Sequence, residues 1–225
     1  MRRRLLSLYH RLHARLGPQG WWPGRTRFEV IVGAILAQNT NWGNVEKAIR
    51  RLRRASALSP QAMSALSRRR LAQLIRPAGT FAVKARRLQN FLTFLEMRHG
   101  GSLRRLFREE PMRIREALLQ VSGIGPETAD SILLYAGNMP VFVVDAYTTR
   151  ICARHRLISP RAPYQEVQDL FMNHLPRDAR LYNEFHALLV AIGKTYCRST
   201  PQCDTCPLRS DLERHGIPLP ATDDR

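Results

Sequence analysis

The stretch Leu119-Gln120-Val121-Ser122-Gly123-Ile124-Gly125-Pro126-Glu127-Thr128-Ala129-Asp130 decides how the rest of the sequence is interpreted. Its Gly-x-Gly turn is followed by a proline, which is favoured at the first position of a helix. The pattern therefore predicts a helix, a tight turn and a second helix. Because glycine permits positive φ and close approach to the backbone, amide N–H groups at the second helix start can face a phosphate. Taken alone, the same turn also suits two ordinary packed helices.

Apolar residues recur at helical spacing along most of the chain, and strand signals are scarce. This pattern predicts an all-α protein of about ten helices. Thr26 with Glu29 has the spacing of a capping box, and Ser59-Pro60 places a cap before an N1 proline. Further helices are expected over residues 44–54, 81–98, 111–120, 127–136, 146–155, 164–174 and 180–194.

The charge balance favours a polyanionic partner. The 225 residues include 36 Lys+Arg and 18 Asp+Glu, which gives a formal net charge of +18. Only Lys47, Lys84 and Lys194 are lysines, so a codon bias toward arginine is an alternative explanation. Hydrophobic residues make up 44% of the chain, enough for a packed core, and no apolar run has membrane-spanning length. With no secretory leader recognisable at the N-terminus, we expect a cytoplasmic, monomeric protein without membrane contact.

One acidic residue stands out downstream of the hairpin. Asp145 follows the apolar run Val141-Phe142-Val143-Val144 and precedes a predicted helix. As an isolated residue it is adequately explained as a helix N-cap, which stabilises by about 1 kcal/mol.

Taken together, these segments resemble the endonuclease III superfamily of helix-hairpin-helix DNA glycosylases. The hairpin, Val143-Val144-Asp145 and Arg150 match its helix-hairpin-helix, its Gly/Pro-rich loop and its aspartate. The similarity extends from about residue 20 to 210. It also covers Ala37-Gln38-Asn39-Thr40, Ile75-Arg76-Pro77-Ala78-Gly79 with Lys84-Ala85, and the C-terminal cysteines.

The resemblance implies a two-lobed all-α fold with a DNA-binding cleft between the lobes. Residues 26–137 would form a central lobe ending in the hairpin. Residues 1–25 with 138–225 would form the second lobe, carrying the aspartate and the cysteine loop. The implied partner is double-stranded DNA containing damaged bases, near the nucleoid.

The resemblance also implies roles at the reaction centre. Breaking an N-glycosidic bond develops positive charge on the sugar, so Asp145 would stabilise that state after the base is flipped out. Gln38 and Asn39 would act as a polar wedge, although Gln38 also suits an exposed helix end. The residues expected at the DNA backbone are Gly123, Ile124, Gly125 and Thr128.

Glu127 departs from the pattern of the bifunctional members. In those enzymes a lysine of the second hairpin helix attacks the sugar and supports strand cleavage through a Schiff base. A carboxylate cannot form a Schiff base, and an acid in the first turn of a helix is favourable in its own right. We therefore expect a monofunctional glycosylase. Only Lys47, Lys84, Lys194 and the chain's amino terminus could replace the missing amine.

The residues around Glu127 are most similar to the 3-methyladenine DNA glycosylase III type. Trp21, Trp22 and Trp42 resemble aromatic base-stacking positions of that branch, and Glu127 is assigned to the same pocket. Alkylated purines are cationic, so stacking on electron-rich rings could select them by about 0.5–2 kcal/mol per contact. Packing in the core is the alternative role for Trp21 and Trp22.

Cys197, Cys203 and Cys206 resemble the superfamily's C-terminal [4Fe–4S] loop. The ligand set is incomplete, because Leu212 stands where a fourth cysteine is expected and Cys152 lies in a predicted core helix. His215 or Asp211 could complete the site, or it could be empty.

Three alternatives stay open at this level. A bifunctional endonuclease III acting on oxidised pyrimidines is disfavoured by Glu127, and nothing in the sequence supports a mismatch glycosylase. A non-catalytic DNA-binding module would use the hairpin and the positive charge without Asp145. Changing Asp145 to Asn separates this module from the enzyme.

Overall fold

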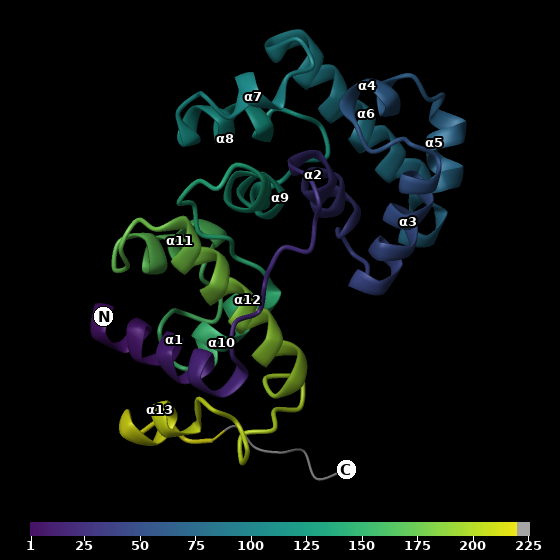
Figure 1. Ribbon diagram of the computed structural model, residues 1–225. Helices are drawn as coiled ribbons and strands as arrows, with labels where there is room; N and C mark the ends of the chain where they lie inside the picture. Colours follow the sequence, from purple (N-terminus) through teal and green to yellow (C-terminus); the bar gives the residue numbers. More distant parts are fainter. Residues whose placement is uncertain (220–225) are drawn as a thin grey trace. The chain divides into compact units, whose positions relative to one another are not determined.

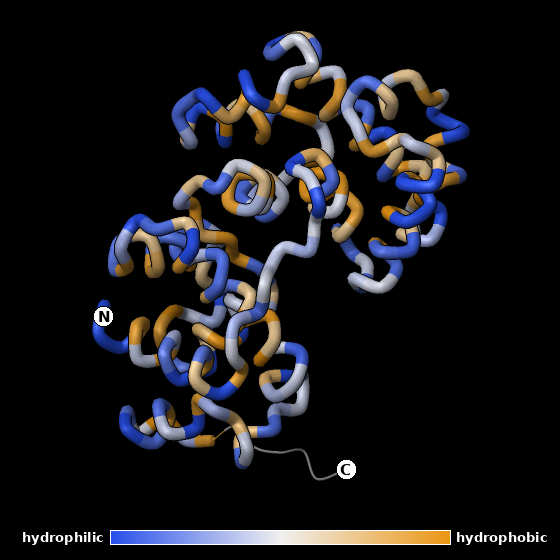
Figure 2. Tube along the Cα trace, viewed as in Figure 1, coloured by the Kyte–Doolittle hydropathy of each residue, from blue (hydrophilic) through white to orange (hydrophobic). Residues whose placement is uncertain are grey.

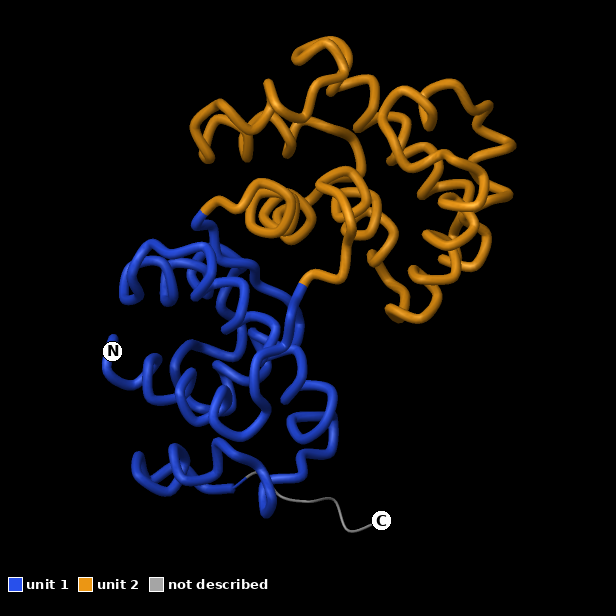
Figure 3. The backbone as a smooth tube through the Cα atoms, viewed as in Figure 1, with its two compact units in different colours: residues 1–21, 140–225 blue, residues 22–139 orange. Residues whose placement is uncertain are grey.

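The computed structural model describes residues 1–219 and divides into two compact units (Figures 1 and 3). Unit 2 comprises Trp22–Met139, and unit 1 comprises Met1–Trp21 with the chain from Pro140 onward. Residues 220–225, which the sequence assigned to the second lobe, lie outside the described part. The described residues contain helices and no strand, which confirms the all-α prediction.

Unit 2 is built around α2 (Arg27–Leu36), which is buried along its whole length except at its first residue. This helix packs against α3, α6, α9 and η2. The other elements of the unit are α3 (Trp42–Arg54), α4 (Pro60–Ser64), α5 (Arg68–Leu74), η1 (Arg76–Ala78), α6 (Phe81–His99), α7 (Leu103–Leu106), α8 (Pro111–Leu119), α9 (Pro126–Ser131) and η2 (Ile132–Ala136).

Two predicted helix starts are confirmed. Thr26 Oγ1 accepts a hydrogen bond from Glu29 N at 3.1 Å, and Ser59 Oγ accepts from Ala62 N at 3.2 Å. At the Thr26 helix start, the second contact of a capping box, from the Glu29 side chain back to the Thr26 N–H, is not formed. The Glu29 carboxylate is buried and pairs instead with the Arg53 guanidinium of α3 at 2.6 Å. A tertiary ion pair has therefore replaced a local contact.

The second helix of the hairpin differs from the single helix expected over residues 127–136. It is α-helical to Ser131 and continues as a π-helical segment, η2, in which Gly137 N donates to Ile132 O at 3.0 Å. Such widened turns are rare. The remaining predicted helices are present, with ends that differ by no more than two residues, as is usual for helix ends.

Unit 1 contains α1 (Arg2–Leu16), which was not predicted, together with α10 (Ala146–Arg154), α11 (Tyr164–Met172), α12 (Ala179–Thr195) and α13 (Arg209–Arg214). The central helix α12 packs against α10 and α1. Phe142 and Phe171 stack beside it with ring centroids 3.9 Å apart. In Figure 2 hydrophobic and hydrophilic residues intermingle along these helices, as expected for amphipathic elements.

No helix within residues 1–219 combines the length and the apolar character needed to cross a membrane.

Candidate active site

The two hairpin glycines differ in backbone conformation and in the space around their Cα atoms. Gly123 has φ +95°, and a Cβ there would run into the aliphatic part of Arg87. Gly125 is the N-cap of α9 with extended backbone (φ −97°, ψ 179°), so the positive φ that glycine permits is used at Gly123 alone. A Cβ on Gly125 would meet nothing within 4 Å. The chain's own packing therefore does not require glycine at position 125.

Gln38 braces the hairpin from the turn after α2. Its Nε2 donates to Gly123 O at 3.0 Å and to Thr128 Oγ1 at 2.9 Å, while its Oε1 accepts from Arg87. Gln38 is half-buried, and therefore is not the freely exposed helix-end residue that was the alternative. Its neighbour Asn39 is exposed and has φ +52°.

Three further hairpin residues have distinct surroundings. Ile124 is buried, and its amide donates to Val121 O at 2.9 Å, so neither its side chain nor its N–H faces outward. Thr128 is buried beneath Gln38, whereas Glu127 is exposed in the first turn of α9. Of the predicted backbone-contacting residues, Gly123 and Gly125 are therefore the exposed ones.

Unit 2 also holds an aromatic cluster of Trp22, Trp42 and Tyr135. The Trp22 ring lies 5.1 Å from Trp42, edge to face, and 5.0 Å from Tyr135. A Cβ on Gly33 of α2 would lie 3.0 Å from Trp22 Nε1, so this glycine lets the indole approach the helix closely. Tyr135, in the π segment η2, was missed by the sequence reasoning because nothing local distinguishes it from a core residue.

The third predicted tryptophan, Trp21, contacts a lysine. It belongs to unit 1, where Lys194 Nζ is 5.6 Å from the centre of its ring. Of the predicted tryptophans, Trp22 and Trp42 are in ring contact within unit 2.

Lys84 has a structural position in unit 2. Its side chain is buried, and Nζ donates to Ala78 O at 2.6 Å, which satisfies a carbonyl at the end of η1. Burial, together with the nearby Arg87, lowers the pKa of this amine. Lys47 and Lys194, by contrast, are exposed.

Asp145 is the N-cap of α10 in unit 1. Its Oδ1 accepts from Thr148 N at 2.7 Å, and Oδ2 lies 3.7 Å from His186 Nε2 of α12. The preceding apolar run is buried, and its Phe142 carbonyl accepts from Gln168 Nε2 at 2.6 Å. The side chain keeps 13% of its surface exposed. The geometry suits a helix cap and equally an oriented carboxylate open to a ligand.

His186 was not identified from the sequence. It is buried in the apolar face of α12, and this burial lowers the pKa of its imidazole, while the Asp145 carboxylate acts in the opposite direction. An aspartate fixed by a helix start and facing a buried histidine can stabilise positive charge nearby without moving.

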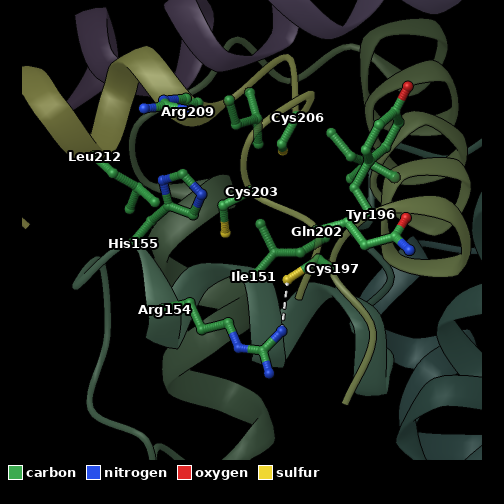
Figure 4. Close-up of a pocket in the computed structure, with 12 residues that line it drawn as sticks. Ile151, Arg154, His155, Tyr196, Cys197, Gln202, Cys203, Cys206, Arg209 and Leu212 are labelled. Atoms are coloured by element: carbon green, nitrogen blue, oxygen red, sulfur yellow. Dashed lines mark hydrogen bonds between the residues drawn. The ribbon is translucent and has the colours of Figure 1, made fainter. Parts of the chain in front are cut away.

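The cysteine loop surrounds a pocket in unit 1 (Figure 4). Cys197, Cys203 and Cys206 all line it, and it is partly open to solvent. Arg154 Nη1 donates to Cys197 Sγ at 3.2 Å. Thiols are the ligands that iron–sulfur clusters use, so the donor chemistry fits such a group with three of four cysteine ligands present.

The fourth position of this loop is apolar. Leu212 is buried and lines the pocket. Neither Asp211 nor His215, the substitutes considered from the sequence, belongs to the pocket lining. Within residues 1–219 no group of three or more His, Cys, Asp or Glu side chains is arranged to hold a single metal ion. Cys152 is a core residue, as expected, and burial raises the pKa of its thiol to about 12.

Comparison with known proteins places these features in context. Residues 32–177 match the model of the HhH-GPD superfamily of base excision DNA repair proteins. The protein MJ1434 of Methanocaldococcus jannaschii, provisionally named a DNA repair glycosylase, is 42% identical over 206 residues, covering 91% of this chain and 94% of its own.

Two solved structures share the fold. The H. pylori 3-methyladenine DNA glycosylase MagIII, solved with 1,N6-ethenoadenine, has a TM-score of 0.75 at 27% identity, covering 84% of this chain and 97% of that one. An endonuclease III–DNA covalent intermediate has a TM-score of 0.79 at 23% identity, covering 96% and 99%.

Proposed function

Since the chain belongs to the HhH-GPD superfamily of base excision DNA repair proteins, we propose that it is a monofunctional DNA glycosylase for alkylated purines. The family establishes a DNA repair glycosylase that acts on DNA. Hydrolysis without strand cleavage and the choice of base are our own inferences. They are supported by Asp145, by Glu127 and by the aromatic cluster.

Asp145 carries the proposed reaction. As the bond between base and sugar breaks, the base leaves with the electron pair and positive charge develops on the deoxyribose ring. The Asp145 carboxylate, oriented through Thr148 N, would stabilise this charge. A water molecule then bonds to the anomeric carbon and gives a proton to the carboxylate or to solvent. The key observation is a partly exposed carboxylate whose second oxygen is not committed to the helix cap.

Glu127 supports hydrolysis over strand cleavage. It is an exposed acid in the helix turn where bifunctional relatives would need a lysine nucleophile. Lys84 is a poor substitute because its amine is buried against Ala78 O. An intact strand with an abasic site is then the expected product.

The aromatic cluster supports a cationic base as the substrate. Trp22, Trp42 and Tyr135 present three electron-rich rings from unit 2, and such rings attract cations. A base alkylated on a purine ring nitrogen is cationic and leaves as a neutral molecule, so it needs little acid catalysis. The H. pylori relative named for 3-methyladenine supports the same choice.

A substrate panel tests the proposal. Duplexes carrying 3-methyladenine, an oxidised pyrimidine or a mismatch are incubated with the protein, and strand breaks are scored with and without alkali. We expect alkali-dependent breaks at the alkylated purine alone. Breaks without alkali at oxidised pyrimidines would instead identify a bifunctional enzyme.

Borohydride trapping on abasic DNA tests the missing lyase step separately. We expect no strong covalent adduct, because a Schiff base requires an accessible amine. A strong adduct that disappears in Lys194→Ala or Lys47→Ala would overturn the monofunctional assignment while leaving the glycosylase intact. Lys84→Ala is the matched control, because it removes a lysine whose amine is buried.

A further inference from the structure

The cysteine pocket contains a fourth donor that the cysteine spacing does not predict. His155 is the C-cap residue of α10, with only 5% of its surface exposed, and its side chain lines the same pocket as the three cysteines. Figure 4 shows its imidazole ring and the three sulfur atoms around this pocket. The ring therefore belongs to the cysteine site although it comes from a different helix.

The other side of the imidazole ring is held by a carboxylate. His155 Nδ1 lies 2.7 Å from Asp211 Oδ2, and Asp211 is in turn held by Arg4, with Nε–Oδ1 at 3.1 Å and Nη2–Oδ2 at 2.8 Å. Arg4 also donates to the His155 carbonyl at 2.7 Å. Because an ionised carboxylate only accepts hydrogen bonds, Nδ1 carries the proton.

This arrangement leaves the second nitrogen of the ring available. In the neutral ring with its proton on Nδ1, Nε2 has a lone pair that can bind a metal. Metal-binding histidines commonly donate their other ring N–H to a carboxylate, which fixes the tautomer and the ring orientation. His155 and Asp211 have this relationship.

We propose that Cys197, Cys203, Cys206 and His155 together bind an iron–sulfur cluster, with His155 Nε2 as the fourth ligand in place of a cysteine at position 212. Leu212 then forms an apolar part of the pocket wall. The inference concerns a structural group and does not depend on the proposed substrate. Histidine ligands to iron–sulfur clusters are chemically established.

Two observations favour a cluster over a single ion. The four donors line one pocket, and in the described residues no three His, Cys, Asp or Glu side chains are arranged for one metal ion. The Arg154 N–H at Cys197 Sγ also stabilises a thiolate in the way that hydrogen bonds to cluster sulfurs do. A neutral imidazole makes the site less negative than four thiolates, which raises the reduction potential.

The experiment uses the full-length protein purified without oxygen. Iron and sulfide per chain, visible absorption and nitrogen hyperfine couplings of the reduced cluster are measured after labelling histidine with nitrogen-15. We expect about four irons per chain and a strongly coupled histidine nitrogen. A chain with zinc, without iron, or with iron but no such coupling would overturn the proposal.

Variants at His155 test the ligand itself. His155→Ala should lose at least about one iron in four. His155→Cys should keep the iron and lose the nitrogen coupling. The double variant His155→Ala with Leu212→Cys should recover the iron. His215→Ala is the matched control, because His215 also contacts Asp211 but does not line the pocket. It should change neither readout.

Loss of the fold is distinguished from loss of a ligand. If His155→Ala fails to fold, the wild-type nitrogen coupling and the His155→Cys variant still decide the question. An iron content and a nitrogen coupling that are unchanged in His155→Cys would reject His155 as the ligand.

Discussion

The hairpin of unit 2 and the cysteine pocket of unit 1 are built in different ways. The hairpin is determined by its own backbone, with Gly123 at positive φ and Gln38 bonded to its carbonyl. The cysteine pocket gathers side chains from a loop and from the end of α10 around a space. A motif that depends on the backbone conformation of one segment can be predicted from that segment's sequence. A set of ligands from different segments can be identified only once the chain has folded.

The largest expected effect on base release is at Asp145. It tests whether a residue of unit 1 with a proposed catalytic role can be changed without destabilising the fold. Asp145→Asn should reduce base release by at least about 10³-fold, because the carboxylate charge is removed. Asparagine is also a good N-cap, so stability should change by less than about 1 kcal/mol. Base release and DNA binding are measured on the same duplex. Unimpaired release would leave Asp145 with the role of a cap alone.

The next effect separates the two hairpin glycines. Gly123→Ala should destabilise the protein by about 1–3 kcal/mol in urea unfolding, because it combines positive φ with a clash against Arg87. Gly125→Ala, where a Cβ meets nothing in the chain, should cost less than about 0.5 kcal/mol. Its DNA affinity should nevertheless fall if the backbone approaches a phosphate there. Equal destabilisation by Gly123→Ala and Gly125→Ala would contradict the conclusion that the fold requires glycine only at position 123.

A smaller effect is expected in the aromatic cluster. Trp42→Leu should slow release of cationic 3-methyladenine by about 2- to 30-fold, corresponding to the loss of a cation–π contact of about 0.5–2 kcal/mol. Release of neutral 1,N6-ethenoadenine should change less. Phe94→Leu serves as the comparison, since the Phe94 ring packs against Phe91 and His99 of the same unit. A uniform loss for both bases would indicate packing instead of charge recognition.

The smallest effect concerns pH and the buried His186. Its pKa is lowered in the folded state, so below about pH 6.5 the unfolded chain binds more protons than the folded one. Stability should therefore decline as the pH falls from about 7.5 to about 5.5, and less steeply in His186→Gln. The free energy of unfolding is measured at both pH values. An unchanged slope in the variant would show that other groups produce the decline.

Sequence reasoning was strongest where the cause is local. The helix caps at Thr26 and Ser59, the hairpin and the cap position of Asp145 all follow from residues within a few positions of one another. It failed where a distant residue intervenes, as when Arg53 draws Glu29 away from the capping box. The sequence also did not identify Tyr135, His186 and His155. Each of these residues gains the neighbours that matter for its role only when the helices pack together.

The π segment Ile132–Ala136 gives the hairpin helix one residue more than an α-helix of equal turns would hold. Each residue of an α-helix turns the chain by about 100°. A deletion in a regular α-helix would rotate the residues beyond it by this amount. A deletion here would instead remove the extra residue, restore a regular helix, leave the residues beyond it in their present orientation and change which residues occupy the positions within the segment. The contact between Tyr135 and Trp22 thus depends on residue number as well as residue identity, and homologues differing by one residue in this helix would present a different side chain to the tryptophan.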